Sequence, residues 1–153
     1  MSSSTSSSSA APAAAPAPSL VAPHVARLDA AELGALLEAP NASTKLLVVD
    51  VRDPGTEGGF IKGAINVPKA RFDEDAFVDE FLDKHAPRGT LLVFHCLNSN
   101  GRGPTAAGRV HDRINAKYEG DDKPQVRVLK GGFRVFSETY GLDSPLIDPT
   151  DLH

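Results

Sequence analysis

The chain has 153 residues, enough for one domain, and its 41% hydrophobic and 24% charged residues are ordinary for a soluble globular protein. Its net charge of −4 argues against a nucleic-acid partner, because binding to phosphate backbones relies on clustered Lys and Arg. The single cysteine, Cys96, excludes an intrachain disulfide and suits the reducing cytoplasm or nucleus, and no apolar run is long enough to suggest contact with a membrane.

The first 23 residues consist almost entirely of Ser, Ala and Pro, and no Lys, Arg, Asp or Glu precedes Arg27. Such a stretch buries too little apolar surface to offset its chain entropy. We therefore expect residues 1–23 to form a disordered tail and residues 24–153 to form one catalytic domain. A transit peptide shares the Ser and Ala bias but usually carries Arg, which is missing here.

The predicted domain begins with a helix and a buried strand. Asp29, followed three residues later by Glu32, resembles a capping box at the start of a helix. The apolar run at 46–49 is typical of a strand buried on both faces of a parallel sheet. A shorter strand is expected at 64–67, where Pro68 closes it because proline cannot donate to a sheet.

Helices and strands continue to alternate in the second half of the chain. An acidic start and a Phe77/Phe81 pair predict a helix from Asp73 to about Lys84. A second buried apolar run then predicts a strand that ends at His95 and Cys96. The remaining predicted elements are a helix that has Pro104 in its first turn and runs to about residue 116, a strand at 126–129, a turn at Gly131-Gly132 and a helix at 134–140. This alternation indicates an α/β fold, with a parallel sheet covered by helices on both faces.

The segment after the second buried strand has the composition of an oxyanion site. Five residues separate Cys96 from Arg102, which lies at the start of a helix whose first turn contains Pro104. A loop that curls into a helix N-terminus aims several backbone N–H groups at one point, and the helix dipole adds positive potential. This potential favours the thiolate of Cys96, which is the attacking form, and Arg102 can bind two oxygens at once. The predicted substrate-binding residues are Leu97, Asn98, Ser99, Asn100, Gly101 and Arg102.

The alternative for Cys96 is a small buried hydrophobic residue, which leaves Arg102 and the turn-rich loop unexplained. We assign no general acid, although Asp53, Glu57, Asp73 and Glu138 are candidates by residue type. The five histidines show no ligand spacing with other donors, so we expect no metal and no cofactor. We expect His95 to be packed and hydrogen-bonded, and to point away from the loop.

Four blocks of sequence resemble the rhodanese-fold phosphatases, specifically the M-phase inducer phosphatases of the cell cycle and small relatives that include fungal and plant arsenate reductases. Besides the Cys96 loop, the blocks are 48–52 (VVDVR), 57–66 (EGGFIKGAIN) and 129–133 (LKGGF), in matching order over about residues 28–140. The resemblance implies a rhodanese-like fold with a central parallel sheet of about five strands. It also implies that Cys96 takes the phosphoryl group and water then hydrolyses the phosphocysteine, while Asp50 and Arg52 form a structural ion pair or turn cap.

The chain departs from this family at two positions. Phe60 replaces the histidine that is usual in the Gly-Gly-His-Ile motif, and we expect it to serve packing. Gly101 stands where the cell-cycle enzymes have a glutamate, which argues against the same kinase substrate.

The resemblance favours a cysteine-dependent protein phosphatase of tyrosine or dual specificity, with a phosphorylated protein or small oxyanion as its substrate. The alternative is an arsenate reductase, which with one cysteine needs glutathione or glutaredoxin as external reductant. A thiosulfate sulfurtransferase is less favoured because such enzymes typically have a loop one residue shorter. A non-catalytic phospho-binding module would leave the intact Cys96 and Arg102 without a role.

Overall fold

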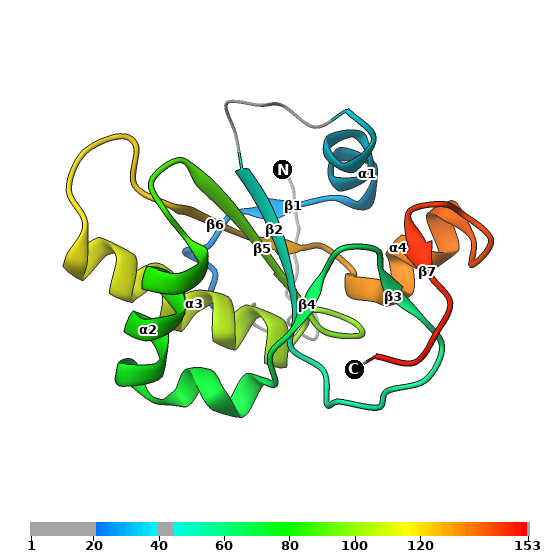
Figure 1. Ribbon diagram of the computed structural model, residues 1–153, viewed down its shortest axis with the longest axis horizontal. Coiled ribbons are helices and arrows are strands. Elements are labelled where there is room, and N and C mark those ends of the chain that lie inside the picture. Colours follow the sequence, from blue (N-terminus) through cyan, green and yellow to red (C-terminus); the bar gives the residue numbers. More distant parts are fainter. Residues whose placement is uncertain (1–20, 40–44, 153) are drawn as a thin grey trace, which may run out of the picture.

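The computed structural model describes residues 21–39 and 45–152 (Figure 1). The predicted tail, residues 1–23, lies outside the described residues except for its last three. Residues 21–23 belong to a turn that Arg27 holds, because its guanidinium donates to the carbonyl oxygens of Val21, Ala22 and Val25 over 2.6–2.8 Å. The chain is therefore anchored before its first strand begins.

Five parallel strands form the central sheet, in the order β1-β6-β5-β2-β4 (Figure 1). Strands β2 and β5 pair along their whole length, with Asp50 opposite His95 at their carboxyl ends. This register places the chain after β2 beside the chain after β5, where Cys96 follows. The strands span β1 (Arg27–Leu28), β2 (Lys45–Asp50), β4 (Ile65–Asn66), β5 (Thr90–His95) and β6 (Gln125–Leu129). The predicted parallel sheet of about five strands is confirmed.

Helices cover both faces of this sheet, as predicted. On one face, α1 (Ala30–Glu38) and α4 (Gly132–Tyr140) pack against the sheet through a buried cluster that includes Leu33, Phe133 and Phe136. On the other face lie α2 (Asp75–His85) and α3 (Arg102–Lys117), as Figure 1 shows. No helix in residues 21–39 and 45–152 combines the length and the apolar character that crossing a bilayer demands.

Aromatic rings fill the core beneath α2 and α3. Phe72 belongs to the 3-10 helix η2 (Lys69–Asp73), and its ring centroid lies 5.2 Å from that of Phe81 and 5.4 Å from that of Phe94. All three rings are buried, and each contributes roughly 1.5–3 kcal/mol through the apolar surface it removes from water. The core therefore holds the end of β5 firmly between the helices.

Several element boundaries differ from the sequence prediction. The capping box of Asp29 and Glu32 is present and starts α1 at Ala30. Helix α3 begins at Arg102, so Pro104 lies in its first turn as predicted, whereas α4 begins at Gly132 rather than at residue 134. The strand expected at 64–67 is limited to Ile65–Asn66. A short antiparallel pair, β3 (Phe60–Ile61) with β7 (Ile147–Asp148), was not predicted, and in it Phe60 is buried as expected for a packing role.

Candidate active site

The first turn of α3 is seated against the backbone of Cys96. A Cβ atom on Gly103 would lie 3.0 Å from the backbone nitrogen of Cys96 and 3.0 Å from the Cα of His95, so a larger residue would push the helix away. Gly101 is the N-cap of α3, and the first turn has neither a side-chain cap nor an acidic residue. The positive end of the α3 dipole is therefore not neutralised by its own side chains.

Helix α4 contacts the same loop from the other face of the sheet. The N–H of Phe133 donates to the carbonyl oxygen of Cys96 over 3.0 Å, and the N–H of Arg134 donates to that of Leu97 over 2.9 Å. In a trans peptide the C=O and N–H bonds point in opposite directions. The N–H groups of Leu97 and Asn98 therefore point away from α4. In the described part of the chain, no backbone N–H from residue 97 to residue 102 donates a hydrogen bond to the protein.

The contact between α4 and the loop depends on a glycine. Gly132 has a φ of +63°, and a Cβ there would lie 2.4 Å from the carbonyl oxygen of Leu97 and 2.6 Å from that of Cys96. No side chain fits in this space. The glycine pair that the sequence predicts as a turn thus also orients the peptide groups beside Cys96.

Ser99 is strained and has an unsatisfied hydroxyl group. Its φ is +53°, a left-handed conformation that costs a residue with a side chain about 1–2 kcal/mol. The residue is 9% exposed, and its Oγ makes no hydrogen bond to any described group. A buried hydroxyl without a partner costs about 1–3 kcal/mol. A ligand oxygen within the loop would relieve this cost.

The nucleophile and the cation that the sequence predicts lie in contrasting environments. Cys96 is 3% exposed and packs within the core cluster of the α2 and α3 face. Arg102 is exposed, and no carboxylate or carbonyl of the described residues pairs with its guanidinium. Asn98 and Asn100 are exposed, and Asn98 accepts a 2.6 Å hydrogen bond from Nε of Arg134. Sequence reasoning missed Arg134, although it directly follows the recognised LKGGF block.

A buried polar cluster beneath the loop joins three of the sequence blocks. Arg52 donates to both oxygens of Asp50, with Nη2–Oδ2 at 2.7 Å, so the expected structural ion pair is present. The same guanidinium donates to the carbonyl oxygen of Gly59 and lies 4.7 Å above the ring of Phe133. The blocks that were matched separately therefore meet at one place, next to His95.

His95 is fully buried beside this cluster. Its Nδ1 lies 3.0 Å from the carbonyl oxygen of Cys96, and because a carbonyl only accepts, Nδ1 is the donor. Its Nε2 has no hydrogen-bond partner among the described residues and lies 3.8 Å from Oδ2 of Asp50. Burial lowers the pKa of His95, so the ring is neutral near pH 7. The expectation of a packed, hydrogen-bonded residue is met at Nδ1 but not at Nε2.

The structure does not single out a general acid. Asp53, Glu57 and Glu138 are exposed, and Asp73 forms a 2.9 Å ion pair with Lys69. Within the described residues, no carboxyl group is hydrogen-bonded to residues 97–102 or ion-paired with them. The four acids thus stay without an assigned role.

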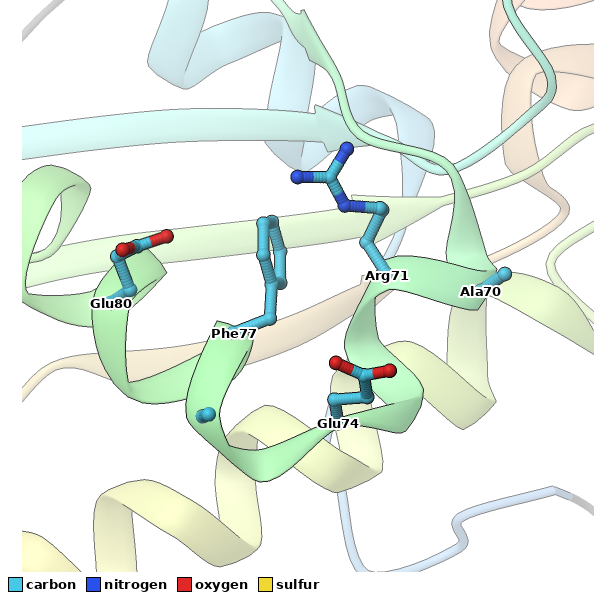
Figure 2. Close-up of a pocket in the computed structure, with 6 residues that line it drawn as sticks. Ala70, Arg71, Glu74, Phe77 and Glu80 are labelled. Carbon is cyan, nitrogen blue, oxygen red and sulfur yellow. The ribbon is translucent and has the colours of Figure 1, made fainter.

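A separate hollow of about 380 Å³ lies between η2 and α2 (Figure 2). Its lining includes Glu74 and Glu80, and the guanidinium of Arg71 lies 4.6 Å above the ring of Phe77. The hollow contains no cysteine or histidine, and we assign no chemistry to it.

The fold and the site together define an α/β domain of the rhodanese type, in which a cysteine at the end of a central strand precedes a loop that enters a helix N-terminus. The profile of the rhodanese-like domain family matches residues 29–139, and the chain belongs to this family. The membership predicted from the four sequence blocks is confirmed.

Relatives within this family are named as phosphatases. The dual specificity phosphatase ibp1 of Schizosaccharomyces pombe is 33% identical over 132 residues, which cover 75% of this chain and 89% of that protein. The human M-phase inducer phosphatase 1 is 33% identical over 99 residues, which cover 63% of this chain but only 19% of that protein. The chain therefore spans most of one relative and about a fifth of the other.

Two solved structures share the fold. A yeast protein tyrosine phosphatase of the rhodanese family has a TM-score of 0.67 and 28% identity, over 82% of this chain and 93% of that one. An As-Sb reductase from Leishmania major has a TM-score of 0.62 and 29% identity, over 80% of this chain and 84% of that one. Structures named as a phosphatase and as a reductase are thus both similar to this chain.

Proposed function

We propose that this chain is a cysteine-dependent protein phosphatase that acts on phosphotyrosine, or on both phosphotyrosine and phosphothreonine. The unpaired N–H groups of residues 97–102 carry this proposal, because they gather beside the start of α3. A phosphoryl group in transfer spreads its charge over three oxygens and requires several fixed donors at once. The relatives named as phosphatases support the same reaction class.

The reaction has two steps. In the first, the thiolate of Cys96 attacks phosphorus, an S–P bond forms, and the bond from phosphorus to the ester oxygen breaks. In the second, water attacks the phosphocysteine, the S–P bond breaks, and inorganic phosphate leaves. In both steps the loop N–H groups bind the non-bridging oxygens and Arg102 contributes two further donors. The hydroxyl of Ser99 supplies another donor.

The environment of the loop favours aryl over alkyl phosphates. No carboxyl group of the described residues is bonded to the loop, so a leaving group that departs without a proton reacts most readily. The phenol of tyrosine, with a pKa of about 10, is a far better leaving group than an aliphatic hydroxyl. We therefore expect phosphotyrosine to be hydrolysed faster than phosphothreonine.

Hydrolysis of p-nitrophenyl phosphate by the purified chain tests the proposal. Cys96→Ser should abolish turnover, and Arg102→Lys should lower kcat by about 10²–10³-fold, as expected when a transition-state donor is lost. Arg109→Lys is the matched control, because Arg109 lies on the same helix and bonds to Asp75 and to the carbonyl of Asp73. Equal turnover in wild type and Cys96→Ser would contradict the proposal.

Arsenate reduction is the second candidate, and the similarity to the As-Sb reductase favours it. Arsenate has nearly the shape and charge of phosphate, so the same donors would bind it. Since Cys96 is the single cysteine, an external thiol such as glutathione or glutaredoxin must release the arsenic and supply the electrons. Glutathione-dependent loss of arsenate that requires Cys96 would support this function, and no loss with either thiol donor would reject it.

We place the activity in the cytoplasm or the nucleus, with phosphorylated proteins as its substrates. These compartments keep a single free thiol reduced. Fluorescence microscopy of the tagged chain tests the location, and a signal confined to the secretory pathway, to mitochondria or to plastids would contradict it.

A further inference from the structure

A second group of reactive side chains lies at the other surface of α3, outside the loop. His24, from the segment before β1, meets His111 and Asp112 of α3, and their ligand atoms all lie within 4.8 Å of one another. Sequence reasoning missed this group, because His24 lies far from the other two residues in the chain. In the fold, Ala22 and His24 lie beside Gly108 of α3.

Packing on both sides holds His24 in place. Val25 is 1% exposed, and Ala22 packs against the core beneath α3. A Cβ on Gly108 would lie 3.0 Å from the Cβ of Ala22 and 3.8 Å from Nε2 of His24, so the segment rests directly on the helix. The bonds from Arg27 to three carbonyls before β1 add to this anchoring. The ring of His24 is therefore positioned by the fold.

One of the distances within this group, between His24 and Asp112, matches the spacing of two ligands around a small metal ion. Nε2 of His24 lies 3.2 Å from Oδ1 of Asp112, and the rings of His24 and His111 are 5.3 Å apart at 63°. Two ligands bound at about 2.0–2.1 Å around a tetrahedral ion lie about 3.3 Å from each other. The pair of His24 and Asp112 already has this spacing, and a modest ring movement of His111 would complete three ligands.

We propose that His24, His111 and Asp112 bind one divalent transition-metal ion, and that Zn²⁺ is the ion they suit best. Two imidazoles and one carboxylate are ligands that zinc takes in proteins, and water fills the fourth position. The side-chain Nδ2 of Asn115 lies 3.1 Å from Nε2 of His111. A hydrogen-bonding neighbour of this kind can orient the imidazole ring of a metal ligand. The bound ion links the segment before β1 to α3, and its role is structural.

The site is open to solvent, so an ion can enter without unfolding of the chain. The side chains of His24 and Asp112 are 47% and 67% exposed. Removal of metal should therefore leave the protein folded, and binding should raise its stability in proportion to the free ion concentration.

Titration of ZnCl₂ into the metal-free, tag-free full chain, followed by calorimetry, tests the proposal. We expect saturable binding of one ion per chain and a rise in the melting temperature with zinc. His24→Gln, which keeps a hydrogen-bond donor for Asp112 but loses the imidazole, should lower the affinity at least about 10-fold and remove the thermal shift. His111→Gln should have the same effect and serves as the second variant if the first folds poorly.

Two controls isolate the proposed site. His85→Gln changes a histidine of α2 and should bind zinc as the wild type does, and so should Cys96→Ser. Cobalt offers an independent readout, since a tetrahedral Co²⁺ complex absorbs visible light and this absorption should vanish in His24→Gln. Equal zinc titrations for wild type, His24→Gln and His111→Gln, or no saturable binding by the wild type, would overturn the proposal.

Discussion

Replacement of Gly132 by alanine is the most direct test of how the loop beside Cys96 is held. The new Cβ would fall 2.4 Å from the carbonyl oxygen of Leu97 and 2.6 Å from that of Cys96, far inside contact distance. The start of α4 must then move away from the loop. The N–H groups of Phe133 and Arg134 lose their acceptors, and the two peptide groups after Cys96 lose their fixed orientation.

The expected loss of stability has two parts. A residue with a Cβ at the φ of Gly132, +63°, costs about 1–2 kcal/mol. Two backbone hydrogen bonds contribute about 1 kcal/mol each. Gly132→Ala should therefore lower the free energy of unfolding by about 3–4 kcal/mol. The same substitution should lower kcat by about 100-fold or more, because the N–H groups of Leu97 and Asn98 are no longer held in their fixed orientation.

Gly141→Ala provides a matched control for the backbone strain. Gly141 also has a positive φ, +83°, but a Cβ there would meet nothing within 4 Å. Because its ψ of +150° lies in a region that residues with a Cβ rarely adopt, this variant should lose about 1–3 kcal/mol from backbone strain alone and should keep its activity. Urea unfolding followed by circular dichroism gives the stabilities, and p-nitrophenyl phosphate turnover is compared where both variants are folded. Equal losses of stability and activity in the two variants would refute the idea that α4 orients the loop.

Three further predictions concern Cys96, His95 and one ion pair. Saturating arsenate should slow alkylation of Cys96 by iodoacetamide at least several-fold, as measured by intact mass. Burial lowers the pKa of His95, so the unfolded state binds the proton more tightly than the folded state. The free energy of unfolding should therefore fall as the pH drops below about 6.5. In urea titrations, His95→Gln should reduce this dependence of the free energy of unfolding on pH. Hydrogen bonds from Arg113 lower the pKa of Asp79. The pair therefore stabilises the fold at pH values above the usual pKa of a carboxyl group, and this stabilisation is lost in acid. Asp79→Asn should weaken the dependence of Tm on pH between pH 2 and 5.

Each of these predictions has a clear contrary result. Alkylation at the same rate with and without arsenate would show that the anion binds elsewhere. A His95→Gln variant with an unchanged pH slope would mean that other groups cause the loss of stability. If the dependence of Tm on pH is the same in Asp79→Asn as in the wild type, the pair of Asp79 and Arg113 is not formed in solution.

The central elements could be predicted from the sequence because their signals are local. The apolar runs at 46–49 and 90–94 become β2 and β5, and the Asp29/Glu32 pattern starts α1 as expected. The two-residue strands were either not predicted or predicted with the wrong bounds, because so short a segment has no periodicity of its own. Strands β3 and β7 form only because the chain brings Ile61 and Ile147 together.

The chemistry of the site could be predicted only in part. The Cys96 loop and Arg102 were recognised from their spacing, since nucleophile, turn and helix start are contiguous. The orientation of the loop depends on Gly132 and Phe133, which belong to a distant block and were expected to form only a turn and the end of a motif. The group of His24, His111 and Asp112 was not predicted, because its members meet only after the segment before β1 packs on α3.

The lengths of the outer strands have a consequence for behaviour at high concentration. Both borders of the five-stranded sheet, β1 and β4, consist of two residues each. A long edge strand exposes unpaired backbone N–H and C=O groups that can pair with another extended chain, and such edge strands promote the growth of sheets between molecules. In this molecule the apolar central strands lie between other strands, and the two edge strands expose too little backbone to pair with another copy of the chain. Concentrated solutions of the folded chain should therefore resist fibril formation.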